Sequence, residues 1–177
     1  GEGQVDEAYA LLSPILSERT PFAMLRHIGK PVGVLDSQAS IDRFLDLIAA
    51  DKTEGGWVVI QSALAQMLER DLVGAFARCR GYIVAADVWY AADTMGEGVV
   101  GQALVSHLRS ALELLDPWRE DEDAWVRRAV GTGVHYWAKR SRGAEELLPQ
   151  ARMLLAFLEP MFGEWDIRAV KGVGWGL

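Results

Sequence analysis

The chain has 177 residues, of which 50% are hydrophobic and 24% are charged, and its formal net charge at pH 7 is −7. This composition suits one folded domain with a real core and excludes a disordered tail, and no apolar run reaches the roughly 18 residues of a membrane span. The negative net charge argues against a protein that binds polyanions without selectivity.

Helices are expected along the whole chain, because apolar residues recur at spacings of three and four rather than two. Residues 1–36 are the hardest segment to interpret. We expect two short helices there, broken by Pro14, Pro21 and Pro31.

N-cap residues mark the helices that follow. Ser40 is expected to open one helix, a second is expected over residues 54–70, and Asp71 and Asp87 are expected to cap the next two. The apolar residues at helical spacing in the first two are expected to face inward. They are Ile41, Phe44, Leu45, Ile48, Trp57, Ile60, Leu64, Met67 and Leu68.

Four more helices are expected over about residues 99–115, 121–140, 144–158 and from Glu164 onward. The first and third of them stop just before a proline, because the residue that precedes proline disfavours helical backbone. The last one carries no stop signal. We therefore expect the chain to end inside a helix, in a fold that is C-terminally incomplete.

A short motif recurs in the second half of the chain. Trp125-Val-Arg-Arg128-Ala-Val and Trp165-Asp-Ile-Arg168-Ala-Val share Trp-x-x-Arg-Ala-Val at a spacing of 40 residues. Two helices per period of this length are typical of HEAT-like helical repeats. We therefore predict an all-α fold, a HEAT-like helical repeat solenoid (α-α superhelix) formed by residues 1–177 as a single domain. The alternative is an ordinary bundle in which the tryptophans mark core positions.

Trp89 and Asp93 lie four residues apart, so they share one face of a helix. A carboxylate beside an electron-rich ring is suited to receive a cation, because the ring face attracts positive charge. The simpler alternative is a core tryptophan with a solvated aspartate.

Arg128, Arg168 and Lys171 are basic residues of the last two repeats. Arg128 and Arg168 occupy the same place in the recurring motif, so we expect them to point the same way. Regularly spaced arginines on one surface are suited to follow a phosphate backbone. Pairing with nearby acids on the helix surface is an equally good interpretation.

The charge is unevenly spread along the chain. Residues 1–117 hold 9 Lys and Arg against 16 Asp and Glu, whereas residues 118–177 hold 9 of each kind. The C-terminal third is therefore the part that repels a phosphate backbone least.

Histidines and cysteine give no metal site. His27, His107 and His135 share no ligand spacing, and Cys79 is the single cysteine, which excludes an intrachain disulfide. With no signal peptide recognised, we expect a cytoplasmic protein.

Three segments in this order resemble the HEAT-like-repeat DNA alkylation repair proteins, the AlkD-type alkylpurine DNA glycosylases. Trp89-x-x-x-Asp93 is similar to the family's Trp-x-x-x-Asp segment, and Trp125-Val-Arg-Arg128-Ala-Val is similar to its Trp-x-x-Arg-Ala helix. The segment ending in Gly174-Trp175-Gly-Leu is similar to a helix in which an aromatic residue follows a Lys-Ala-Ile-Gly-type run. The resemblance covers about residues 57–177.

The resemblance implies a DNA repair protein that binds alkylated duplex DNA and hydrolyses the N-glycosidic bond of positively charged N3- and N7-alkylpurines. It implies that Asp93 is the catalytic carboxylate, that Trp89 and Trp175 contact the lesion, and that Arg128 holds the DNA backbone. It implies no metal and no organic cofactor, and it leaves the oligomeric state open.

A second interpretation is a non-catalytic HEAT-repeat scaffold that binds a protein or peptide in its concave face. The acidic first two thirds of the chain favour this interpretation. The two differ in one observable feature: a glycosylase requires Trp89, Asp93, Arg128 and Trp175 to converge on one concave surface, whereas a scaffold does not.

Overall fold

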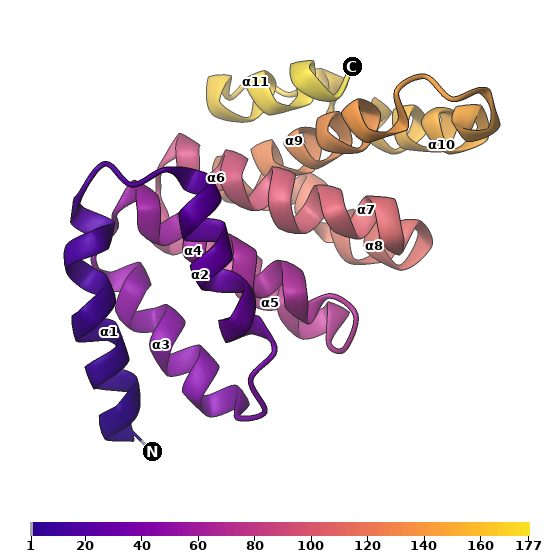
Figure 1. Ribbon diagram of the computed structural model, residues 1–177. Helices are drawn as coiled ribbons and strands as arrows, with labels where there is room; N and C mark the ends of the chain where they lie inside the picture. Colours follow the sequence, from indigo (N-terminus) through magenta and orange to yellow (C-terminus); the bar gives the residue numbers. More distant parts are fainter. Residues whose placement is uncertain (1) are drawn as a thin grey trace.

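The computed structural model describes residues 2–177, and within them every regular element is a helix (Figure 1). The all-α prediction is confirmed. The α-helices are α1 (Glu2–Ser17), α2 (Phe22–Gly33), α3 (Gln38–Ala50), α4 (Glu54–Met67), α5 (Leu72–Ala86), α6 (Trp89–Met95), α7 (Gln102–Ser106), α8 (Leu108–Leu115), α9 (Ala124–Ser141), α10 (Leu148–Leu158) and α11 (Ile167–Gly176). A π-helical turn, η1 (Gly96–Gly101), and the 3₁₀ turns η2 (Asp116–Glu120), η3 (Glu145–Leu147) and η4 (Glu159–Gly163) complete the set.

The helices form two layers that run side by side along the molecule. One layer, the inner layer, consists of α2, α4, α6 with η1 and α7, α9 and α11, each packed on the next. In the other, α1 packs on α3, α3 on α5, and α5 on α8. Figure 1 shows the progression from α1 and α3 at the lower left to α10 and α11 at the top. A helical repeat is stacked in this way, so the predicted repeat architecture is confirmed.

Contacts between side chains repeat at the same period. Arg78 binds Asp42 across 36 residues of sequence, Tyr82 donates to Asp46 across 36, and Trp125 donates to Asp87 across 38. Each repeat thus bonds to the equivalent surface of its neighbour. The core that results is continuous, and it includes all nine residues expected to face inward from α3 and α4.

Helix ends differ from expectation at two of the predicted caps. Asp71 accepts from the backbone N–H of Gly74, as expected. Ser40 does not open α3, because the hydroxyl of Ser37 accepts from the N–H of Ser40 and the helix begins earlier. Asp87 is the left-handed C-cap of α5, with φ of 48°, and not the N-cap of α6.

The prolines of the first 36 residues interrupt less than expected. The two expected helices are present, and Pro21 does precede α2, but Pro14 and Pro31 lie inside α1 and α2. Both lie within the last four residues of their helix, where a missing N–H removes a single hydrogen bond. The burial of Leu12 and Leu16 compensates for that loss in α1.

The helix expected over residues 99–115 is divided. The backbone turns at His107, with φ of −136° and ψ of 44°, so that α7 ends and α8 begins there. The segment before it is π-helical and contains three glycines, Gly96, Gly98 and Gly101. Ideal Cβ atoms at Gly96 and Gly101 would lie within 3.0 Å of α9 side chains, so their small size brings η1 and α9 close together.

Two glycines also bring α9 and α11 into direct contact. A Cβ atom on Gly131 would lie 2.2 Å from the carbonyl oxygen of Gly172, and one on Gly172 would lie 2.3 Å from that of Arg128. The two backbones therefore touch, and α11 is placed by α9 rather than by long side chains. No helix within residues 2–177 is long and apolar enough to span a bilayer.

Replacing Gly131 by alanine should destabilise the protein, because the added methyl group has no room unless α11 moves. Overpacking of this kind costs about 1–3 kcal/mol, which for a chain of this size lowers the thermal midpoint by about 2–4 °C per kcal/mol. Gly81→Ala in the middle of α5 is the matched control, because nothing lies within 4 Å of its Cβ position. Equal midpoints for the two variants would show that the α9–α11 contact is not close.

Candidate functional site

A cleft of about 750 Å³ follows the face of the inner layer. Its walls come from α2, α4, α6, η1, α7, α9 and α11, and no element of the other layer contributes. Trp89, Asp93 and Trp175 all line this cleft, although Trp175 lies more than 80 residues from the other two along the chain. Three of the predicted site residues therefore meet on one surface.

Arg128, the fourth residue that a glycosylase requires on this surface, binds Asp93. The Arg128 guanidinium donates to both carboxylate oxygens, with Nε 2.6 Å from Oδ1 and NH2 2.8 Å from Oδ2. The side chain of Asp93 is 14% exposed and that of Arg128 is 4% exposed. Asp93 is therefore not a solvated aspartate, and Arg128 is not an open surface cation.

The remaining polar groups around the pair are also engaged. The hydroxyl of Thr132 lies 3.3 Å from Asp93 Oδ1 and 3.0 Å from the carbonyl oxygen of Arg128, and its one proton is donated to either of these acceptors. Arg128 NH1 donates to the carbonyl oxygen of Arg168 over 3.1 Å. A carboxylate offers about four acceptor positions. Arg128 takes two of those on Asp93 and Thr132 is within reach of a third, which leaves one or two for a group in the cleft.

Two exposed tryptophans flank this carboxylate. Trp89, at the first turn of α6, is 55% exposed, and Trp175, near the end of α11, is 47% exposed. The Arg128 guanidinium lies 5.0 Å from the Trp175 ring centroid, and the carbonyl oxygen of Trp175 lies 2.9 Å from Nδ1 of His135. An exposed indole next to a carboxylate is poor packing and a good surface for a flat, positively charged ligand.

The two basic motif residues do not point the same way, so that prediction was wrong. Trp125 is the second residue of α9, whereas Trp165 precedes Asp166, the N-cap of α11. The same six letters therefore start at different helix positions. Arg128 is buried in the ion pair, and Arg168 is 46% exposed at its side chain.

Arg168 binds the cap of its own helix. Its NH2 lies 2.7 Å from Asp166 Oδ2, and its guanidinium and backbone N–H lower the pKa of the Asp166 carboxyl to about 2. The Arg168 guanidinium also lies 5.6 Å from the ring centroid of Trp125. Lys171 is exposed, and Arg168, Lys171 and Trp175 follow one stripe of α11 at spacings of three and four. The predicted basic residues of α11 thus share the side of the helix that carries Trp175.

Sequence reasoning missed several residues of the cleft. Arg26 and Lys30 of α2 and Arg140 of α9 add positive charge to it, and Glu54 and Glu97 add negative charge. Arg26 and Lys30 lie four residues apart, so their helical spacing was a usable signal. It was overlooked because the prolines left the bounds of the two helices expected in residues 1–36 undefined.

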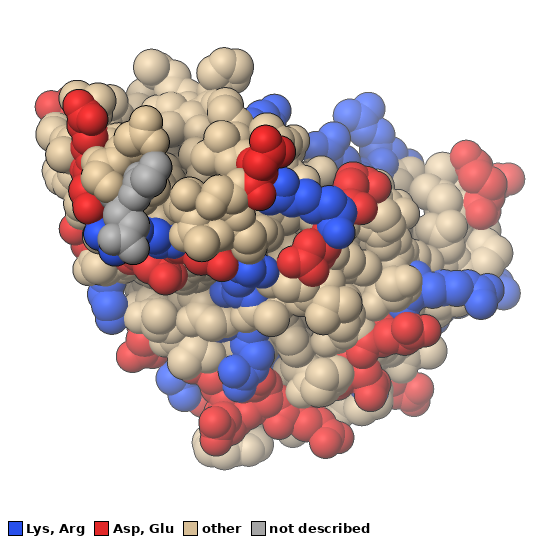
Figure 2. Space-filling model, turned by 90° about the horizontal axis from the view of Figure 1, so that it is seen from below, with Lys and Arg blue, Asp and Glu red and all other residues tan. Residues whose placement is uncertain are grey.

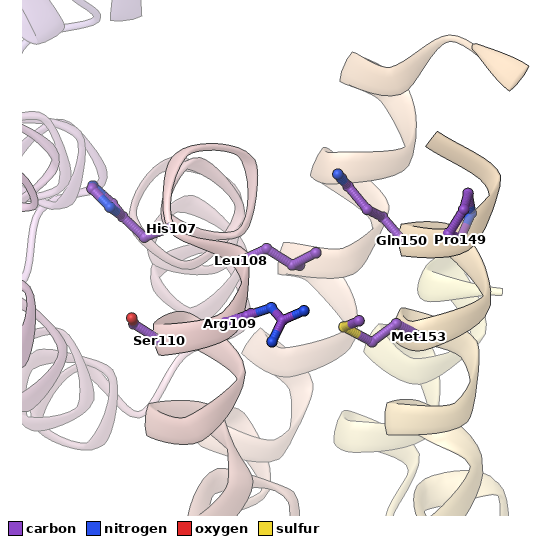
Figure 3. A pocket seen from close by; sticks show the side chains of 7 residues that line it. All are labelled: His107, Leu108, Arg109, Ser110, Pro149, Gln150 and Met153. Atoms are coloured by element: carbon purple, nitrogen blue, oxygen red, sulfur yellow. The ribbon is translucent and has the colours of Figure 1, made fainter. Parts of the chain in front are cut away.

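Other parts of the surface offer less. A hollow of about 490 Å³ lies between α8 and α10, where Leu108 and Arg109 point toward Gln150 and Met153 (Figure 3). It holds none of the predicted site residues. On the face shown in Figure 2, Lys and Arg are interspersed with Asp and Glu, without a continuous basic surface. Within the described part of the chain, no His, Cys, Asp and Glu side chains group as metal ligands.

Comparison with known proteins supports the resemblance seen in the motifs. The model of a family described as DNA alkylation repair enzyme matches residues 23–177. No curated protein and no solved structure was found to match the chain. The family match begins before Trp57 and so covers α2 and α4 as well as the motif-bearing helices. The chain belongs to the DNA alkylation repair enzyme family, and this membership indicates a role in DNA repair with DNA as the partner.

Proposed function

We propose that this protein binds alkylated duplex DNA and hydrolyses the N-glycosidic bond of N3- and N7-alkylpurines. One observation carries the proposal: Trp89, Asp93 and Trp175 line a single cleft, and Arg128 contacts both Asp93 and Trp175 beneath it. A glycosylase requires these four side chains to converge on one surface, whereas a peptide-binding scaffold does not. Their convergence favours the glycosylase.

The proposed reaction needs modest assistance, because an alkylated purine already carries positive charge. The bond between C1′ and the purine nitrogen breaks, and its electron pair leaves with the base, which becomes neutral. The sugar acquires oxocarbenium character, and a water molecule adds to C1′ and gives up a proton. The protein must stabilise the positive sugar and position the water.

Asp93 is suited to both tasks. Asp93 lines the cleft, where a carboxylate lone pair not used by Arg128 can accept from the attacking water or stabilise the positive sugar. Arg128 and Thr132 fix the orientation of the carboxylate from the other side. Trp89 and Trp175 offer ring faces that attract the cationic nucleotide.

The DNA backbone contacts are proposed to come from Arg168 and Lys171, with Arg128 as a further contact. Arg168 and Lys171 are the accessible ones, and both share the stripe of α11 that carries Trp175. Arg128 keeps about two of its five N–H groups free of protein partners, and the residue as a whole is 3% exposed. Its main contribution in this proposal is to position Asp93.

Asp93→Asn should abolish base release and also destabilise the fold. Loss of the charge removes the stabilisation of the positive sugar, and a fall of about 100-fold or more is expected in single-turnover excision at saturating enzyme. The substitution also leaves the buried Arg128 guanidinium without its counter-charge, which costs about 3 kcal/mol. Helical circular dichroism at the assay temperature checks that the variant is folded.

Asp42→Asn is the matched control for that experiment. Asp42 binds Arg78 through two oxygens, as Asp93 binds Arg128, but it lies on the other layer and is 37% exposed at its side chain. Its loss should cost at most about 1 kcal/mol and leave excision unchanged. Wild-type excision by folded Asp93→Asn would remove Asp93 from the catalytic role.

Lys171→Ala should reduce the salt dependence of DNA binding. Each phosphate contact contributes roughly −0.9 to the slope of log K against log salt concentration, so the slope should become shallower by about that amount. Arg109→Ala removes an equal charge from the hollow between α8 and α10 and should leave the slope unchanged. Equal slopes for Lys171→Ala and the wild type would show that Lys171 contacts no phosphate.

A further inference from the structure

One stripe of α9 contacts two of the residues that the proposed function places at the lesion. Arg128, Thr132 and His135 follow each other at spacings of four and three, so they share one face of the helix. Arg128 binds Asp93, and Thr132 lies within hydrogen-bond distance of it. His135, about one turn beyond Thr132, contacts Trp175 of α11. The same face of α9 therefore meets both Asp93 and Trp175.

His135 donates a hydrogen bond to the backbone of Trp175. Its Nδ1 lies 2.9 Å from the carbonyl oxygen of Trp175. A carbonyl oxygen can only accept, so Nδ1 carries the proton. The neutral ring with its proton on Nδ1 and the doubly protonated ring can both make this bond. The contact therefore needs no proton transfer by His135.

The backbone around Trp175 has few side chains to hold it. The residue lies between Gly174 and Gly176, and glycine has more backbone freedom than any other residue. Nothing lies within 4 Å of a Cβ atom placed on Gly174. Gly176 packs on the backbone of Gly131, which sets how closely α11 approaches α9. The hydrogen bond from His135 adds a directional contact, which fixes how the last turn of α11 is rotated against α9.

We propose that His135 is a positioning residue, and that its hydrogen bond to the Trp175 carbonyl holds the indole where the lesion nucleotide binds. This inference rests on the proposed function, because it takes Trp175 as a lesion contact. The Arg128 guanidinium lies 5.0 Å from the centroid of the Trp175 ring and also binds Asp93. Two residues of α9 thus fix the carboxylate and the indole relative to each other. Misplacement of a binding group by about 1 Å can lower a rate by about 100-fold.

The hydrogen bond is one of two contacts between His135 and Trp175. Their ring centroids lie 6.1 Å apart with an interplanar angle of 45°, which is an ordinary aromatic contact. Two substitutions separate these contacts. His135→Phe keeps a ring and removes the donor, whereas His135→Asn removes the ring and places an amide nitrogen where Nδ1 lies. If the hydrogen bond positions Trp175, the asparagine should restore what the phenylalanine loses.

The first measurement is single-turnover release of methylated purines from methylated duplex DNA at saturating enzyme. His135→Phe should lower the rate about threefold to tenfold, which corresponds to the loss of one hydrogen bond. His135→Asn should release the bases at the wild-type rate and with the wild-type dependence on pH, because the donor is restored and His135 transfers no proton. Circular dichroism and the thermal midpoint check that each variant is folded at the assay temperature.

His107→Phe is the matched control. His107 is also a half-buried histidine with a hydrogen-bond partner, since its Nε2 lies 3.1 Å from Oε1 of Glu69. It lies between α7 and α8 and does not line the cleft. Its replacement should leave the rate of base release unchanged.

A second measurement does not depend on base release. The NMR order parameter of the Trp175 indole N–H reports how firmly the ring is held, and its signal is identified by its absence from Trp175→Phe. The order parameter should fall in His135→Phe and keep its wild-type value in His135→Asn.

The two measurements separate failure of this inference from failure of the glycosylase proposal. If the wild type releases bases, three results would overturn the role of His135 alone: an unchanged rate in His135→Phe, an unchanged order parameter in that variant, or a loss in His135→Asn as large as in His135→Phe. If the wild type releases no base, the glycosylase proposal fails. The order parameters of the two variants then decide whether the hydrogen bond from His135 holds Trp175.

Discussion

The ion pair between Asp93 and Arg128 joins α6 to α9 across the inner layer, and much of the cleft depends on it. Arg128 uses both of its forked edges at once: two N–H groups bind Asp93, and a third binds the carbonyl oxygen of Arg168 in α11. One guanidinium therefore connects three successive helices of the inner layer. A buried pair of this kind is stable only while both partners remain, because each leaves an uncompensated charge if the other is lost.

Glycine makes that arrangement possible. The contact of Gly131 with Gly172 lets the backbones of α9 and α11 touch, and the carbonyl oxygen of Arg128 lies where a side chain on Gly172 would be. This close approach brings α11 near enough for Arg168 to accept from Arg128 and for Trp175 to lie beside the guanidinium. In η1, the absence of a side chain at Gly98 gives the Gln61 amide its space. Small residues thus set the spacing between helices, and the polar groups follow from that spacing.

Under the proposed function, the charge distribution of the cleft suits selective rather than general DNA binding. The cleft is lined by basic residues, Arg26 and Lys30 on α2 and Arg140 on α9, and by the acidic residues Glu54 and Glu97. A uniformly basic groove would hold any duplex through its phosphates. Under the proposed function, a mixed groove with exposed tryptophans would rely more on the lesion itself, whose positive charge is attracted by carboxylates and ring faces.

The sequence by itself determined the helical fold, the repeat period and the membership of the family. Apolar spacing, Asp71 as a cap and the buried stripes of α3 and α4 are local properties, since a helix is specified by residues three and four apart. The pair Trp89 and Asp93 could be found for the same reason. The boundary near Ser40 was misplaced because Ser37, a second possible cap three residues earlier, opens the helix. Near Asp87 and Pro14 the local signals are weak, and propensity alone does not decide where a helix ends.

Only the tertiary structure decided which side chain each site residue meets. Arg128 and Arg168 share a motif in the sequence, yet Arg128 is buried against Asp93 and Arg168 binds Asp166, the N-cap of its own helix. The reason is that the two motifs start at different positions relative to the N-cap. Gln61 was not predicted to line the cleft, because its neighbour there, Gly98, lies 37 positions away along the chain. Contacts one repeat apart depend on how closely helices stack, and that distance is set by packing rather than by any local pattern.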